Sequence, residues 1–183
     1  LMCGTGVGFS VEEENTHKLP KVAYEIKPSS TTILVDDSKE GWASAYRELI
    51  SLLYSGILPS WDVSQIRPEG SRLKTFGGRA SGPKPLEDLF RFTVTIFQGA
   101  VGRRLTTLEG HDLMCMIAKV VVVGGVRRSA MISLSDLTDD RMREAKTGMW
   151  WEGNNQRALA NNSAVYENRR PDMQIFMKNW KSL

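Results

Sequence analysis

The chain has 183 residues, of which 41% are hydrophobic and 25% are charged, so it can build one ordinary domain with its own core and is not disordered. Its net charge of +3 is small and dispersed, which excludes the basic stripe of a typical nucleic-acid-binding protein. The longest apolar run, residues 117–123, is interrupted by Lys119 and is too short for a membrane span, and the opening residues lack a signal-peptide pattern. We therefore expect a cytoplasmic protein with neither nucleic acid nor membrane as a partner.

The first part of the chain carries short strand patterns. Val7, Phe9 and Val11 alternate with small residues, which is the period of a half-buried strand. Residues 21–26 and 33–35 predict two further short strands.

The clearest helix signal begins at Asp37, which we interpret as the N-cap, with Glu40 three residues later as in a capping box. Gly56 ends the pattern, and residues 63–66 predict a strand after it. The apolar residues of this helix recur at helical spacing: Trp42, Tyr46, Leu49, Ile50 and Leu53.

Two more helices follow a loop over residues 68–85 that is rich in Gly, Pro and Ser. Thr106 and Glu109 form a capping box that starts the second of them, and Gly124 ends it. In the first, these residues recur at helical spacing on one face: Leu86, Leu89, Phe90, Thr93 and Phe97.

The last part of the chain predicts strands over residues 129–134 and 160–166, and helices from Thr138 and over residues 171–180. Helices and strands alternate along the whole chain, without a clear domain boundary. The fold class that this order predicts is α/β.

Two helix starts could receive a phosphate group. Gly77 to Pro83 includes Arg79 and Ser81 and precedes a helix, where backbone N–H groups favour an anion; a flexible turn explains the segment equally well. Asp36, Asp37, Ser38 and Lys39 open the earlier helix. Capping alone accounts for them, but a carboxylate could also bind a ribose hydroxyl while Lys39 meets phosphate.

A glycine- and arginine-rich loop joins the apolar helix to the strand that follows. Its arginines offer planar donors for a phosphate or a base edge, so we favour a ligand-binding loop over a solvated connector. The loop consists of Gly124, Gly125, Val126, Arg127, Arg128 and Ser129.

The two cysteines, Cys3 and Cys115, are far apart, and His17 and His111 stand alone. This spacing predicts neither a metal site nor a disulfide. We expect Cys115, on the apolar helix, to be an ordinary core residue.

Several segments, in this order, resemble the adenosylcobalamin-dependent (class II) ribonucleotide reductases. They are MCGTGVGFSVE at residues 2–12, GGRASGPKPLEDLF at 77–90, RRLTTLEGHDLMCMIAKVVVVGGVRRSAMISLSDL at 103–137 and WWEGNNQRALANNSAVY at 150–166. VDDSKEGWASAYRELI at residues 35–50 resembles the insertion of the monomeric, triphosphate-reducing branch. The similarity covers nearly the whole chain, which we expect to be one internal segment of the catalytic domain with an insertion-like region at about residues 20–75.

The resemblance implies part of a ten-stranded α/β barrel, in which adenosylcobalamin generates a thiyl radical that starts reduction of a ribonucleoside triphosphate. Thioredoxin or a similar dithiol would regenerate the enzyme. The radical-loop motif of the family does not occur in this sequence, and neither Cys3 nor Cys115 matches a catalytic cysteine position. We therefore assign no catalytic residue and expect the isolated chain to be inactive.

The resemblance also implies roles in the control of specificity. Asp36, Asp37, Ser38 and Lys39, together with Arg79 and Ser81, would bind a deoxynucleoside triphosphate effector. Residues 124–129 would form the loop between effector and substrate base. Two alternatives remain: the large subunit of a class I diphosphate reductase, which the insertion-like segment disfavours, and a non-enzymatic nucleotide-binding regulatory domain.

Overall fold

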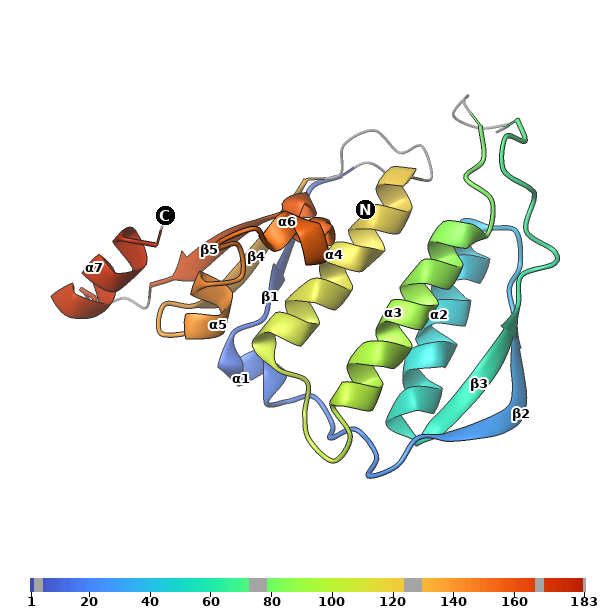
Figure 1. Cartoon of the computed structure of the whole chain (residues 1–183), viewed down its shortest axis with the longest axis horizontal. Helices are drawn as coiled ribbons and strands as arrows, with labels where there is room; N and C mark the ends of the chain where they lie inside the picture. Colours follow the sequence, from blue (N-terminus) through green and yellow to red (C-terminus); the bar gives the residue numbers. More distant parts are fainter. Residues whose placement is uncertain (2–4, 73–78, 124–129, 167–169, 183) are drawn as a thin grey trace.

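The computed structural model describes residues 1, 5–72, 79–123, 130–166 and 170–182. The described residues form two small sheets and three long helices. Figure 1 shows the long helices as a layer between the sheets. In chain order the elements are β1 (Val7–Ser10), α1 (Glu13–Thr16), β2 (Lys27–Leu34), α2 (Lys39–Tyr54), β3 (Ile57–Asp62), α3 (Lys84–Gly99), α4 (Thr107–Val123), β4 (Met131–Asp136), α5 (Asp140–Arg143), α6 (Trp150–Gly153), the 3-10 helix η1 (Asn155–Leu159), β5 (Ala160–Val165) and α7 (Met173–Trp180).

Both sheets are parallel. The larger has the order β1-β4-β5, and its first row pairs Val7 with Met131 and Met131 with Ala160. The smaller pairs β2 with β3. Parallel neighbours need a crossover connection, and α2 provides it in the smaller sheet. The α/β fold class is therefore confirmed.

The main core lies between the smaller sheet and the helices α2, α3 and α4. The face predicted for α3 is confirmed, because Leu86, Leu89, Phe90, Thr93 and Phe97 are all buried. Trp61 of β3 meets the Phe90 ring edge-on at 5.4 Å between ring centres, which ties the smaller sheet to α3.

A second, smaller core lies where α4 covers one face of the larger sheet. Cys115 and Ala118 of α4 pack there against Met131 and Ala160, the first residues of β4 and β5. Cys115 is fully buried, which confirms its assignment as a core residue. On the opposite face of β4, Ile132 is 46% exposed.

The predicted capping box at the start of α4 is confirmed. The Thr106 N–H donates to Glu109 Oε2 at 2.8 Å, and the Glu109 N–H donates to Thr106 Oγ1 at 3.2 Å. These reciprocal bonds satisfy backbone groups that the helix itself leaves without partners.

Two strand predictions are wrong. Residues 21–26 form no strand, and β2 begins only at Lys27. The residues of β2 are mostly polar and exposed, so the sequence lacks the apolar alternation that predicts a strand. Residues 63–66 form a turn, closed by the Ile66 N–H on the Val63 oxygen at 3.0 Å, and the strand is β3 before it. The sequence also gave no sign of the short helix α1.

Candidate functional site

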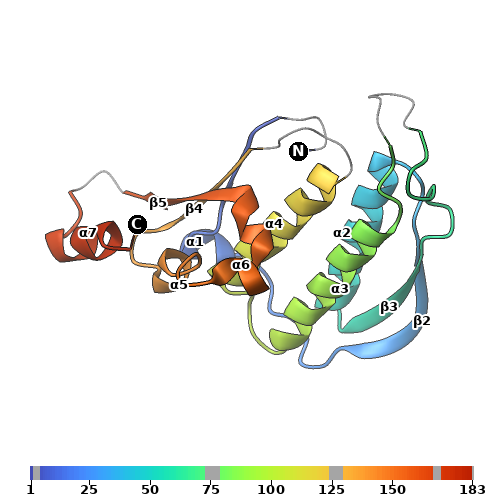
Figure 2. The same cartoon turned by 45° about the horizontal axis from the view of Figure 1, so that its top comes forward.

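The N-termini of two long helices lie at the same end of the helix layer. Figures 1 and 2 show α2 and α3 running in one direction and α4 running back, so that α4 ends where the other two begin. We call this region the helix-start end. Unpaired N–H groups and the helix dipoles place partial positive charge at the starts of α2 and α3, which favours an anion there.

The start of α2 differs from the prediction in one respect. Ser38, not Asp37, is the N-cap, and its Oγ accepts the Gly41 N–H at 2.9 Å. The Asp37 carboxylate instead accepts a hydrogen bond from Arg67 Nε at 2.6 Å. The capping role assigned to Asp37 is therefore wrong, because a basic side chain from the β3–α3 connection occupies its carboxylate.

This geometry predicts different costs for two substitutions. Ser38→Ala removes the cap and should lower the free energy of unfolding by about 1 kcal/mol. Asp37→Asn should cost less, because the Asp37–Arg67 pair is about one-third exposed and such ion pairs contribute roughly 0–1 kcal/mol. Urea unfolding of both variants checks the order; a larger loss for Asp37→Asn would mean that the ion pair with Arg67 contributes more than the Ser38 cap.

Gly41 is a second residue that sequence reasoning missed at this site. A Cβ at this position would lie 2.6 Å from Asp36 Cβ and 2.7 Å from the Asp36 backbone oxygen. The turn at Asp36 therefore rests directly on the first turn of α2, and only glycine leaves room for it. Asp36 and Lys39 are exposed on either side of the cap.

Arg79 and Ser81 belong to the β3–α3 connection and have local partners. Arg79 Nη1 donates to the Gly70 oxygen at 2.9 Å, beside the backbone bonds that pair Gly70 with Ala80 and Ala80 with Ser71. Ser81 Oγ lies 3.5 Å from the Gly82 oxygen. The structure thus gives Arg79 a role in closing the base of a loop and brings Arg67, rather than Arg79, into contact with residues 36–39.

The predicted loop of residues 124–129 lies outside the described residues. A buried polar network joins the first half of α4 to β4, away from the end of α4 at Val123. His111 Nδ1 lies 2.9 Å from Ser133 Oγ, and His111 Nε2 lies 3.5 Å from Cys115 Sγ. Burial lowers the pKa of His111 to about 4 and raises the pKa of the Cys115 thiol to about 12, so both groups are uncharged at neutral pH.

In a neutral imidazole one ring nitrogen donates and the other accepts. Either the thiol S–H donates to His111 Nε2 and Nδ1–H donates to Ser133 Oγ, or the Ser133 hydroxyl donates to Nδ1 and Nε2–H donates to the Cys115 sulfur. A thiol of such high pKa is a poor nucleophile, and it lies within the core. Cys115 is therefore a packing residue in this structure.

A buried ion pair lies one residue away on the same helix. Arg157 donates from Nε and Nη2 to the two Asp112 oxygens at 2.7 and 2.6 Å, and from Nη1 to the Ala145 oxygen at 2.7 Å. Both side chains are about nine-tenths buried. This pair fixes η1, and with it the start of β5, against α4.

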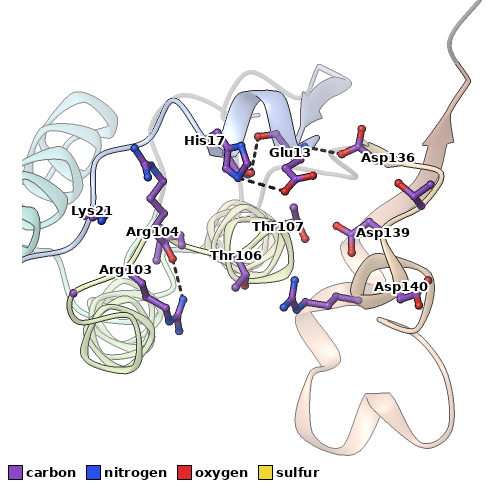
Figure 3. A pocket seen from close by; sticks show the side chains of 15 residues that line it. Glu13, His17, Lys21, Arg103, Arg104, Thr106, Thr107, Asp136, Asp139 and Asp140 are labelled. Carbon is purple, nitrogen blue, oxygen red and sulfur yellow. Dashed lines mark hydrogen bonds and ion pairs between the residues drawn. The ribbon is translucent and has the colours of Figure 1, made fainter.

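A polar cavity of about 800 Å³ opens at the other end of the larger sheet. It lies outside the carboxyl ends of β1 and β4, which is where open parallel sheets commonly bind ligands. Figure 3 shows the basic side chains of Lys21, Arg103 and Arg104 on one side and the acidic side chains of Asp136, Asp139 and Asp140 on the other. Between them lie Thr106, which precedes α4, and Thr107, its first residue.

Within the described ranges, no three His, Cys, Asp or Glu side chains come together as a metal site. Nor does any helix in that part of the chain have the length and apolar character needed to cross a membrane.

Comparison with known proteins gives one consistent family. The family model "B12-dependent ribonucleotide reductase, insertion domain" matches residues 13–96. The adenosylcobalamin-dependent ribonucleoside-triphosphate reductases of Lactobacillus acidophilus and Levilactobacillus brevis are 31% and 30% identical over 87% and 91% of this chain. A crystal structure of a B12-dependent (class II) ribonucleotide reductase matches 89% of the chain with a TM-score of 0.77 at 26% identity. The chain spans about a quarter of the length of these relatives, 27% and 28% of the two sequences and 27% of the solved chain.

Proposed function

Because the chain belongs to the B12-dependent (class II) ribonucleotide reductase family, we propose that the protein carrying it reduces ribonucleoside triphosphates to 2′-deoxyribonucleotides with adenosylcobalamin. The structural match over most of the chain is the observation that carries this proposal. The match to an insertion domain of B12-dependent enzymes disfavours a class I diphosphate reductase.

Within that enzyme, we propose that this segment controls specificity rather than performing the radical chemistry. Cys115 is fully buried and packs against Met131 and Ala160, as expected for a core residue. None of the described residues is assigned to hold the cofactor. A ten-stranded α/β barrel is a further part of the proposal, and it would cover the sheet face opposite α4, where Ile132 is 46% exposed.

The proposed effector site is the helix-start end. Two helix N-termini provide partial positive charge, Arg67 adds a guanidinium, and Asp36 with Lys39 stands exposed at the cap. A deoxynucleoside triphosphate would place its phosphates at these groups, with Arg79 and Ser81 in the adjoining loop. Thioredoxin or a similar dithiol as reductant, a monomeric state and a cytoplasmic location are further parts of the proposal.

We propose that residues 124–129 pass the effector signal to the substrate base. Arg127→Ala and Arg128→Ala, made singly in the full-length protein, should flatten the effector-dependent choice among the four bases by several-fold to about a hundredfold, which is the range of typical allosteric coupling. Lysine should rescue incompletely, because it lacks the planar fork.

The measurement is the relative reduction of competing ribonucleotides with each effector present. Arg91→Ala, which removes an arginine from an exposed ion pair on α3, is the matched control and should keep the parent's selectivity. If both loop variants also keep it, residues 124–129 only connect α4 to β4.

A further inference from the structure

The cavity at the carboxyl ends of β1 and β4 has basic groups without acidic partners. Among the described residues, Lys21, Arg104 and Arg141 line it and form no ion pair. Arg104 uses only Nε, which donates to the Leu19 oxygen at 2.8 Å. Arg103 differs, because both of its Nη groups bind Glu109 at 2.7 Å.

The carboxylates of the cavity are already engaged. Asp136 accepts the Glu13 N–H at 2.6 Å, and Asp139 accepts the Met142 N–H at 3.1 Å. Asp140 lies between Arg143 and Lys178, and Glu13 lies 3.3 Å from His17. Four acidic and four basic side chains line the cavity, so its formal charge is balanced overall. Lys21 and Arg104 lie on the side away from Asp136, Asp139 and Asp140, so positive charge is concentrated on that side (Figure 3).

The first residue of α4 supplies an independent observation. Thr107 lines the cavity and is 8% exposed, and its Oγ1 is buried without a hydrogen-bond partner in the described structure. A buried hydroxyl without a partner is unfavourable and uncommon, so it calls for a ligand that it can bind. It lies at the N-terminus of a 17-residue helix, where the dipole favours negative charge.

We propose that this cavity is a binding site for a phosphoryl anion, held by the Thr107 hydroxyl, the start of α4 and the side chains of Lys21, Arg104 and Arg141. A volume of about 800 Å³ accommodates a phosphorylated small molecule. The site lies at the opposite end of α4 from the helix-start end, so it is distinct from the proposed effector site.

Two variants separate ligand binding from folding. Thr107→Val keeps the side-chain shape and removes the hydroxyl; Arg104→Gln removes a charge at the cavity. Each should weaken the binding of inorganic phosphate or pyrophosphate about tenfold or more, as expected for the loss of a charge-assisted hydrogen bond. Because the Thr107 hydroxyl has no partner among the residues that the structure describes, Thr107→Val should not lower the thermal midpoint.

The matched controls are Thr95→Val and Arg91→Gln on α3, whose side chains bind the Arg91 oxygen and Glu87 respectively. Calorimetric titration with phosphate, pyrophosphate and adenosine monophosphate identifies the source: tighter pyrophosphate indicates a polyphosphate ligand, tighter monophosphate a nucleotide, and equal affinities a single phosphoryl group. The proposal is overturned if neither phosphate nor pyrophosphate binds saturably, or if the cavity variants bind them as the parent does.

Discussion

Replacing Arg157 by alanine is expected to lower the free energy of unfolding by about 3–5 kcal/mol, the usual cost of leaving one partner of a buried ion pair alone. Asp112 would keep a charge in a position that is about nine-tenths buried, and the Ala145 oxygen would lose its donor. Urea unfolding at neutral pH gives the value directly.

Two further variants test whether the lost stability comes from the burial of this ion pair. Arg91→Ala removes an arginine from an exposed pair on α3 and should cost less than about 1 kcal/mol. The double change Arg157→Met with Asp112→Leu removes both charges and should recover much of the loss, because apolar residues of similar volume often replace buried pairs without penalty. An Arg157→Ala loss no greater than that of Arg91→Ala would show that the pair is not buried as described.

The second large effect concerns pH and His111. Burial lowers the pKa of this imidazole from 6.5 to about 4, so the folded protein binds its proton less readily than the unfolded chain does. Folding stability should therefore fall as the pH drops below about 6.5, and the loss should continue down to about pH 4. At about 1.4 kcal/mol for each pH unit, the loss reaches about 3 kcal/mol.

His111→Asn is the matched control, because its side-chain amide, which can donate or accept, can replace Nδ1 toward Ser133 without titrating. Urea midpoints at pH 7, 5.5 and 4.5 should fall more steeply for the parent than for the variant. Carboxylates titrate in both proteins, so the difference between the two curves isolates the histidine. Parallel curves would contradict a buried, neutral His111.

The helices could be predicted because their signals are local. The buried face of α3 and the capping box of α4 depend on residues three or four apart, and both are confirmed. The sequence pattern of β2 was weaker, because a strand is recognised by alternating buried and exposed residues. All residues of β2 except Ile33 are exposed, so this alternation is missing.

The candidate site was predicted only in part, because its main contacts join distant residues. Asp37 and Arg67 lie 30 positions apart, and Asp112 and Arg157 lie 45 positions apart. A composition or spacing pattern carries no information about such pairs. The sequence therefore indicated that residues 36–39 mark a helix start. It did not indicate that the Asp37 carboxylate binds Arg67 instead of capping the helix.

Reduction of ribonucleoside triphosphates by the full-length protein, with and without adenosylcobalamin, tests the central proposal most directly. We expect deoxynucleotide formation in the presence of a dithiol that stops when the cofactor is withheld and returns when it is restored, with no second protein subunit required. The 183-residue chain alone should form no deoxynucleotide under the same conditions. Activity that persists without cobalamin but requires another subunit would contradict the account and place the protein among the class I enzymes.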